Sequence, residues 1–358
     1  REHDLVIGTF GRAAWVLDDI RPLRALASSS SIIEKDVQLF EPPTAYLAAY
    51  QQPTGSRFGA DAMYQGTNRK YGAMLSYFVN PPVKKDKDSD KEEKANDEDE
   101  AEKKESKKDS LTLMVYDGAR LIRTLKKKVP KEKGIHRWYW NMDEKGVSRP
   151  RRKPSKSKRE PSGVQVKPGT YRLVMSFGDE QSEQTIEVKS DPRLTVDPAN
   201  IDAVYNASKE LEGYTAAAAN AVKQLAESKQ TLADYKKLFK ENKSDEMKAL
   251  LKEMKSQTKT IDSLIALYIG KEDKRQGIVR NPESNVLTRV RNASRYIRSR
   301  QQGITGTENK LLQHAKEELE VAIGQTNTFF KEVWPLLKSK IEAEDASRFK
   351  EIQELSID

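Results

Sequence analysis

The chain has 358 residues, enough for two or three domains of ordinary size. Charged residues make up 33% and hydrophobic residues 36%, so the chain is polar but can still bury cores. Its 64 Lys and Arg exceed its 55 Asp and Glu by only 9, and we expect no nucleic-acid partner. The absence of cysteine excludes disulfides, thiolate metal sites and a cysteine nucleophile. No apolar run is long enough for a transmembrane helix.

The chain opens on two short apolar runs, at residues 5–7 and 14–17, that flank a turn containing Gly8 and Gly11. This pattern predicts a β-hairpin. A hairpin alone is marginally stable in water, and the next dozen residues offer nothing to cover it. We therefore expect the chain to begin inside a larger domain, with these strands pairing with another part of the polypeptide.

Residues 37–188 have the pattern of a small all-β domain. Short apolar or alternating runs are separated by turn signals such as Asp117-Gly118, Pro168-Gly169 and Gly178-Asp179. Several short strands at this spacing predict an antiparallel sandwich. The expected strands cover residues 37–40, 71–79, 111–116, 121–125, 135–140, 170–177 and 185–188.

Two charged tracts interrupt the strands. Residues 84–109 hold 9 Lys and 12 acidic residues in 26 positions, with no aromatic or β-branched residue, and we expect a disordered surface loop there. Residues 149–159 are basic and resemble a nuclear-localisation or nucleic-acid patch, but they contain two prolines and no aromatic residue. We favour a solvated loop for both tracts, with an interaction tail as the alternative.

After Asp191-Pro192-Arg193 the apolar period changes to that of helices. Asp197-Pro198 is a strong helix start, and Ser244-Asp245 opens a second helix. A third follows Pro282, and a fourth begins near Thr307, with Pro335 expected to end or kink it near Trp334. These apolar stripes predict an antiparallel helical bundle.

The search for catalytic templates finds no Gly-rich phosphate loop, His-Glu-x-x-His motif or nucleophile elbow. His3, His136 and His314 lie in three different segments, so we expect no joint metal site. Asp18 and Asp19 are a candidate carboxylate pair for glycoside chemistry, but adjacent strand residues point to opposite faces. A role in a turn or helix cap is the favoured interpretation. We assign no catalytic, cofactor-binding or metal-binding residue.

Two further groups have a functional and a structural interpretation. Trp138 and Trp140 share one strand face and could stack on a sugar ring, although core packing is favoured. Arg291, Arg295, Arg298 and Arg300 form a basic run on the third helix, for which a solvated or ion-paired face is favoured over an anionic partner.

The residues from Asp4 to Asp19 (DLVIGTFGRAAWVLDD) resemble the segment that closes the β-propeller in secreted bacterial proteins of the sialidase-like, sortilin-like repeat group. Proteins of this group are often labelled glycosyl hydrolases with bacterial neuraminidase repeats. Phe10 and Ala13 depart from the commonest residues of that pattern. Residues 134–143 resemble a later strand of the family, with Asn141 where Asp is usual. Pro168-Gly169-Thr170-Tyr171 and Asp191-Pro192-Arg193 resemble the end of its sandwich, which is similar to the immunoglobulin-like domain of flagellar hook-capping proteins.

The resemblance implies an α+β multidomain chain. Residues 1–35 would be terminal strands of a β-propeller, residues 36–192 an antiparallel immunoglobulin-like β-sandwich, and residues 193–358 a helical bundle. Charged, disordered insertions are expected near residues 84–109 and 145–162. In such families, glycosidase chemistry belongs to the earlier propeller blades, and no Asp-box repeat occurs in this chain. No catalytic residue is therefore carried over.

The function predicted from the resemblance is that of a non-catalytic interaction or scaffold module. It would brace the propeller or dock it to a cell-envelope partner, either a protein or a glycan, and be extracytoplasmic: in the periplasm, on the outer-membrane surface or secreted. The alternative is an accessory part of a sialidase-like glycoside hydrolase whose active site lies in the propeller. Whether the parent protein is an enzyme stays open.

Overall fold

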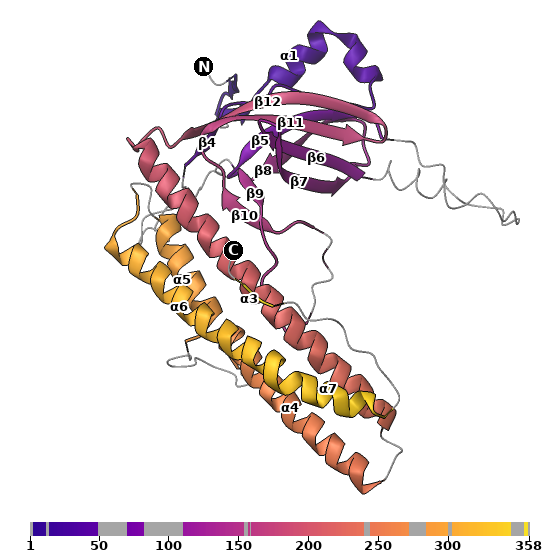
Figure 1. The fold of residues 1–358 in the computed structure, drawn as a ribbon. Coiled ribbons are helices and arrows are strands. Elements are labelled where there is room, and N and C mark those ends of the chain that lie inside the picture. Colours follow the sequence, from indigo (N-terminus) through magenta and orange to yellow (C-terminus); the bar gives the residue numbers. More distant parts are fainter. Residues whose placement is uncertain are drawn as a thin grey trace, which may run out of the picture. The chain divides into compact units, whose positions relative to one another are not determined.

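The structure is a computed structural model that describes residues 3–11, 14–48, 70–81, 110–153, 157, 159–239, 244–271, 284–299, 303–344 and 354–356. The fold is mixed α+β and divides into two compact units. The first comprises Arg1–Lys145 with Gln165–Thr195, and the second comprises Gly146–Val164 with Val196–Asp358. The charged tract at residues 84–109 lies outside the described residues. Figure 1 shows the strands and helices along the chain.

The first unit contains two sheets that share one core. A five-stranded sheet has the order β4 (Ala45–Leu47), β12 (Glu180–Ser190), β11 (Gly169–Phe177), β6 (Ser110–Asp117) and β7 (Arg120–Lys128). A three-stranded sheet has the order β3 (Val37–Leu39), β5 (Ala73–Val79) and β8 (Gly134–Trp140). Alternate residues of both sheets are buried in a common cluster, which includes Leu75, Tyr77, Leu113, Trp140, Leu173 and Met175. Two sheets around one core explain why the strands show an alternating apolar pattern.

The chain changes sheets at Pro42 and Pro43. These prolines cannot donate ladder hydrogen bonds, and they separate β3 in the smaller sheet from β4 in the larger one. As a result β4 pairs with β12 in parallel, whereas every other described pairing in the two sheets is antiparallel. The predicted antiparallel sandwich included neither β4 nor its parallel pairing.

Side chains of β12 also join the two sheets along this edge. The Ser182 hydroxyl accepts a hydrogen bond from the Leu39 amide at 2.8 Å, and Gln184 donates its side-chain amide to the Leu39 carbonyl at 3.4 Å. The main chain of β3 is therefore bonded to side chains of a strand in the other sheet. This arrangement closes one side of the shared core.

The described residues between 3 and 34 form a separate two-stranded sheet followed by two short helices. β1 (Leu5–Gly8) and β2 (Ala14–Leu17) pair as the predicted hairpin. α1 (Arg21–Ser28) and the 3₁₀ helix η1 (Ser30–Glu34) follow, and the sequence analysis did not predict them. Two further short strands, β9 (Asp143–Lys145) and β10 (Ser162–Gln165), lie either side of the basic tract.

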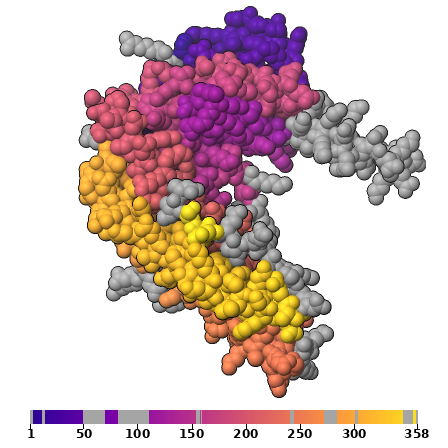
Figure 2. All heavy atoms as spheres, in the orientation of Figure 1, coloured from indigo at the N-terminus to yellow at the C-terminus, as the bar shows by residue number. Residues whose placement is uncertain are grey.

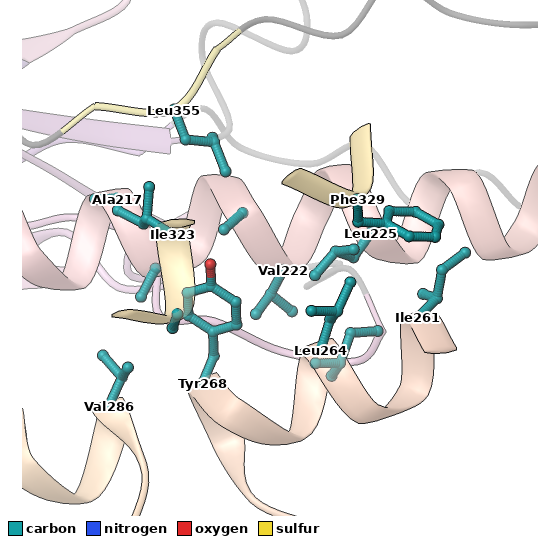
Figure 3. Packing of buried hydrophobic residues seen from close by; sticks show 14 of the residues in the cluster. Ala217, Val222, Leu225, Ile261, Leu264, Tyr268, Val286, Ile323, Phe329 and Leu355 are labelled. Atoms are coloured by element: carbon teal, nitrogen blue, oxygen red, sulfur yellow. The ribbon is translucent and has the colours of Figure 1, made fainter. Parts of the chain in front are cut away.

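The second unit is built around α3 (Pro198–Leu238), whose 41 residues make a rod about 60 Å long. It packs against α4 (Asp245–Ile269), α5 (Val286–Ser299) and α6 (Gly306–Thr328). Helix α3 starts as predicted, with the Asp197 carboxylate accepting the Ala199 amide at 2.9 Å and Pro198 in its first turn. Ser244 caps α4 in the same way, through the Met247 amide at 3.2 Å. The apolar stripes of these helices form one core, part of which Figure 3 shows.

Pro335 neither ends the last helix nor leaves it a regular α-helix. A π-helical turn, η3 (Phe329–Val333), follows α6 and leads into α7 (Trp334–Glu342), with Pro335 in the first turn of α7. Proline has no amide hydrogen, and its ring crowds the carbonyl four residues back, at Lys331. The wider π turn lets the helical path continue past that carbonyl.

Candidate functional site

The hairpin carries an unusual density of exposed apolar side chains. Of the seventeen large hydrophobic residues that are exposed in the described part of the chain, seven lie between residues 5 and 17. Phe10, at the turn, is fully exposed, and Trp15 and Val6 expose 67% and 63% of their surface. The complete set is Leu5, Val6, Ile7, Phe10, Trp15, Val16 and Leu17, which we call the apolar hairpin.

Both faces of the apolar hairpin are hydrophobic. In the observed register, Ile7 lies opposite Trp15 on one face, with Leu5 opposite Leu17. Val6 lies opposite Val16 on the other face. A strand that is covered on one side alternates apolar and polar residues, whereas continuous apolar runs are typical of strands covered on both sides. Exposed apolar patches of this kind mark interaction sites.

The base of the apolar hairpin is held firmly. The Ile20 amide donates to the His3 carbonyl at 2.8 Å, and the Asp19 amide donates to the Asp4 carboxylate at 2.9 Å. Both bonds join the chain before β1 to the chain after β2. Hydrogen bonds therefore close the base of the hairpin, while its apolar side chains stay exposed.

Asp18 and Asp19 connect this base to the sandwich. The buried Asp19 carboxylate accepts the Arg21 guanidinium at 2.6 Å, and Arg21 also donates to the Pro42 carbonyl at 3.4 Å. Arg137 on β8 donates to the Asp18 carbonyl. Asp19 has a positive φ of 51°, which a non-glycine residue adopts at some cost in strain. The pair thus shapes the turn after β2, as the favoured interpretation predicted, and it also anchors the hairpin, which was not predicted.

The two tryptophans of β8 pack in the core, as predicted. Trp140 is fully buried, donates its ring N–H to the Asp143 carbonyl at 3.0 Å, and meets Tyr171 edge to face at 5.5 Å. Trp138 is partly buried against the same core, with the Lys127 ammonium 6.0 Å from its ring centre. Trp140 therefore has no face open to a sugar ring, whereas Trp138 is covered only in part.

The histidines do not come together. His3 contacts Arg24 at 3.3 Å, His136 contacts the Glu132 carbonyl at 2.9 Å, and His314 lies on α6 in the other unit. Among the described residues, no group of three or more His, Asp or Glu side chains is arranged to hold a metal ion.

The basic residues have structural partners at several positions. On α5, Arg295 lies over the Tyr296 ring at 5.6 Å, while Arg291 and Arg298 are exposed; Arg300 lies outside the described residues. In the basic tract, Arg152 donates to the Gly270 carbonyl at 2.6 Å. A cation at that place complements the partial negative charge at the end of α4. No sequence pattern predicted this contact, because Arg152 and Gly270 are 118 residues apart.

Sequence reasoning also missed a buried charge cluster on the first unit. Arg123 and Asp143 are both buried, with 3.6 Å between guanidinium and carboxylate, and Arg120 reaches the buried Glu144 at 3.0 Å. Each carboxylate has an arginine partner, so the arrangement is one of structural ion pairs. Neighbouring charges on β7 and β9 were the available signal, but the pairing depends on the tertiary fold.

Within the described residues no helix is both long and apolar enough to cross a membrane. In comparisons with known proteins, no family model, no curated protein and no solved structure matched this chain.

Proposed function

We propose that this chain is the interaction module of an extracytoplasmic β-propeller protein, in which the apolar hairpin completes a propeller blade and the rest braces that propeller or docks it to a cell-envelope protein or glycan. The two sheets around one core would be an immunoglobulin-like sandwich. The observation that carries the proposal is a hairpin that is apolar on both faces, exposed, and anchored at its base.

The two-sided apolar character favours a propeller partner over a partner that covers one face. Propeller blades are small sheets repeated around an axis, so a blade has a neighbour on each side. A hairpin that joins such a blade gains hydrogen bonds at its open strand edges and cover on both faces. Fully burying an aliphatic or aromatic side chain contributes about 1.5–3 kcal/mol. Burial of the seven side chains of the apolar hairpin is therefore a substantial driving force for association, even after the cost of association is subtracted.

The resemblance of residues 4–19 to a propeller-closing segment supports a β-propeller as the partner. The Gly-Thr-Phe-Gly part and the Trp-Val-Leu-Asp-Asp end of that segment coincide with the described part of the turn and with the second strand and anchor of the hairpin. The sequence motif and the exposed surface therefore fall on the same residues. The expected partner is a β-propeller polypeptide of the kind that this segment resembles.

The experiment is an association assay between this chain and the β-propeller part of the same protein, purified separately. We expect a stoichiometric complex by isothermal titration calorimetry, and we expect Trp15→Asp or Val6→Asp, on opposite faces, to weaken it at least tenfold. Leu336→Asp, which changes an exposed leucine on α7, is the matched control and should bind normally. Association that is unchanged by both hairpin substitutions would disprove the proposal. The complex is also assayed with sialosides, because hydrolysis would favour the hydrolase alternative.

A further inference from the structure

Residues 354–356 make a defined contact with the helical unit, although they have no regular secondary structure. Leu355 is nine-tenths buried and belongs to the helical core cluster. Figure 3 shows its side chain pointing toward the core on the side where Ala217 of α3 and Ile323 of α6 are drawn. In Figure 2 the small bright-yellow group on the orange surface of the bundle is this segment.

Two polar contacts fix the main chain and the residue before the leucine. The Asn327 side-chain amide donates to the Leu355 carbonyl at 3.3 Å. The Lys331 ammonium lies 2.7 Å from the Glu354 carboxylate. One apolar contact, one main-chain contact and one ion pair thus hold two consecutive residues.

Asn327 and Lys331, which make the two polar contacts, lie in a row with Ile323 of the same core cluster. Ile323, Asn327 and Lys331 are spaced four residues apart, so they follow one another along one side of α6 and η3. From Glu354 to Leu355 the segment passes from Lys331 to Asn327, and it therefore runs opposite to α6. Lys331 lies within the π turn, a kind of distortion that is frequent at functional sites.

We propose that this row, Ile323, Asn327 and Lys331 with Ala217 beside it, is a peptide-recognition site for a segment in which an acidic residue directly precedes a leucine. The chain's own Glu354 and Leu355 occupy it as an internal ligand. Each group binds a different part of the segment. The core contacts the leucine side chain, the Asn327 amide binds the main chain, and the Lys331 ammonium binds the carboxylate. The inference is independent of the propeller proposal, because it concerns the helical unit alone.

The test uses a fluorescently labelled peptide of residues 351–358 and the full chain. In the unmodified chain the internal segment competes at a high effective concentration, so added peptide should bind weakly. Leu355→Asp in the chain should release the internal segment and strengthen binding of the peptide at least tenfold, measured by fluorescence anisotropy. A peptide with the same Leu355→Asp change should not bind. Leu336→Asp in the chain is the matched control and should leave peptide binding weak.

A charge swap tests the acidic position. In the Leu355→Asp chain, Lys331→Glu should weaken the native peptide two- to fivefold, since the pair is exposed. A peptide with Glu354→Lys should recover that loss, which a merely structural role of Lys331 would not allow. Lys310→Glu, elsewhere on α6, is the control and should have no effect. Circular dichroism verifies that each variant keeps its helices, and Leu355→Ala replaces Leu355→Asp if it does not.

Two results would overturn the inference. The first is a peptide that binds the released chain no more tightly than the unmodified one. The second is binding that is indifferent to the leucine and to the charge swap. In either case residues 354–356 would only pack against the helical core, and the row would not be a peptide-binding site.

Discussion

The Arg137 guanidinium donates a hydrogen bond to the main-chain carbonyl of Asp18, across 119 positions of sequence. Arg137 lies on the central part of β8, and Asp18 directly follows β2. The contact therefore ties the exposed hairpin to the sandwich of the same unit. It gives the hairpin a fixed base without covering its apolar side chains.

Removing that tie should loosen the hairpin while leaving the sandwich folded. Hydrogen bonds to charged groups contribute about 1.5–3 kcal/mol. For Arg137→Ala we expect amides of residues 5–8 and 14–17 to exchange at least several-fold faster, measured by hydrogen–deuterium exchange mass spectrometry. Arg172→Ala, which breaks an exposed ion pair with Glu183 between β11 and β12, is the control and should not change exchange in the hairpin. Equal exchange in Arg137→Ala and the parent would refute the anchoring role.

The exposed and buried tryptophans of the first unit should differ sharply in their effect on stability. Trp140→Ala removes a fully buried side chain and its hydrogen bond, and should cost about 3–5 kcal/mol. Trp15→Ala should change the free energy of unfolding by less than about 0.5 kcal/mol, because its ring is mostly in solvent. Urea unfolding followed by circular dichroism measures both. A large loss from Trp15→Ala would show that the ring is covered in the isolated chain.

Removing the hydroxyl group from each of two buried tyrosines should affect the free energy of unfolding differently. The Tyr268 hydroxyl is hydrogen-bonded to Thr326 at 2.8 Å, so Tyr268→Phe should cost about 0.5–1.5 kcal/mol. The Tyr77 hydroxyl is buried and has no hydrogen-bond partner among the described residues, so Tyr77→Phe should be neutral or stabilising. Burial raises the pKa of both phenols to about 12, so both are protonated at neutral pH. Thermal unfolding at pH 7 measures the difference, and a destabilising Tyr77→Phe would contradict it.

The junction between β12 and α3 should make stability depend on pH. The Arg193 guanidinium holds the pKa of Asp191 below its ordinary value by bonding to both carboxylate oxygens. A lowered folded-state pKa stabilises the fold above the unfolded pKa of about 4, and that contribution is lost as the pH falls through the folded pKa. Asp191→Asn should therefore be less stable than the parent at pH 7, with the gap closing toward pH 2. Asp245→Asn, on an exposed pair at the start of α4, is the control for urea unfolding at both pH values. A gap that stays constant with pH would exclude this ion pair as its source.

Local patterns predicted most of the regular elements. The hairpin, the strands of both sheets other than β4, and the starts of α3 and α4 follow from alternation, turn residues and caps, all of which act within a few residues. Core positions such as Trp140 followed from the same alternation. The parallel pairing of β4, by contrast, depends on the direction in which the chain continues after Pro42 and Pro43. No local sequence pattern encodes that direction.

The candidate site was predictable only in part. An apolar hairpin without local cover was evident from residues 5–17, and its exposure is seen in the structure. Its anchor was not evident, because Arg137 and Pro42 are distant in sequence from Asp18 and Arg21. The contact of Leu355 with the bundle was missed because residues 351–358 (EIQELSID) hold too few apolar residues to establish a helical or strand period.

The edges of the larger sheet bear on how this chain behaves in solution. On one side β4 and the side chains of Ser182 and Gln184 occupy the border of β12, and on the other side β7 ends in three exposed lysines. Both devices discourage foreign strands from joining a sheet. The apolar hairpin has no such protection, so unwanted aggregation of purified material should start there and should diminish when residues 5–17 are made more hydrophilic.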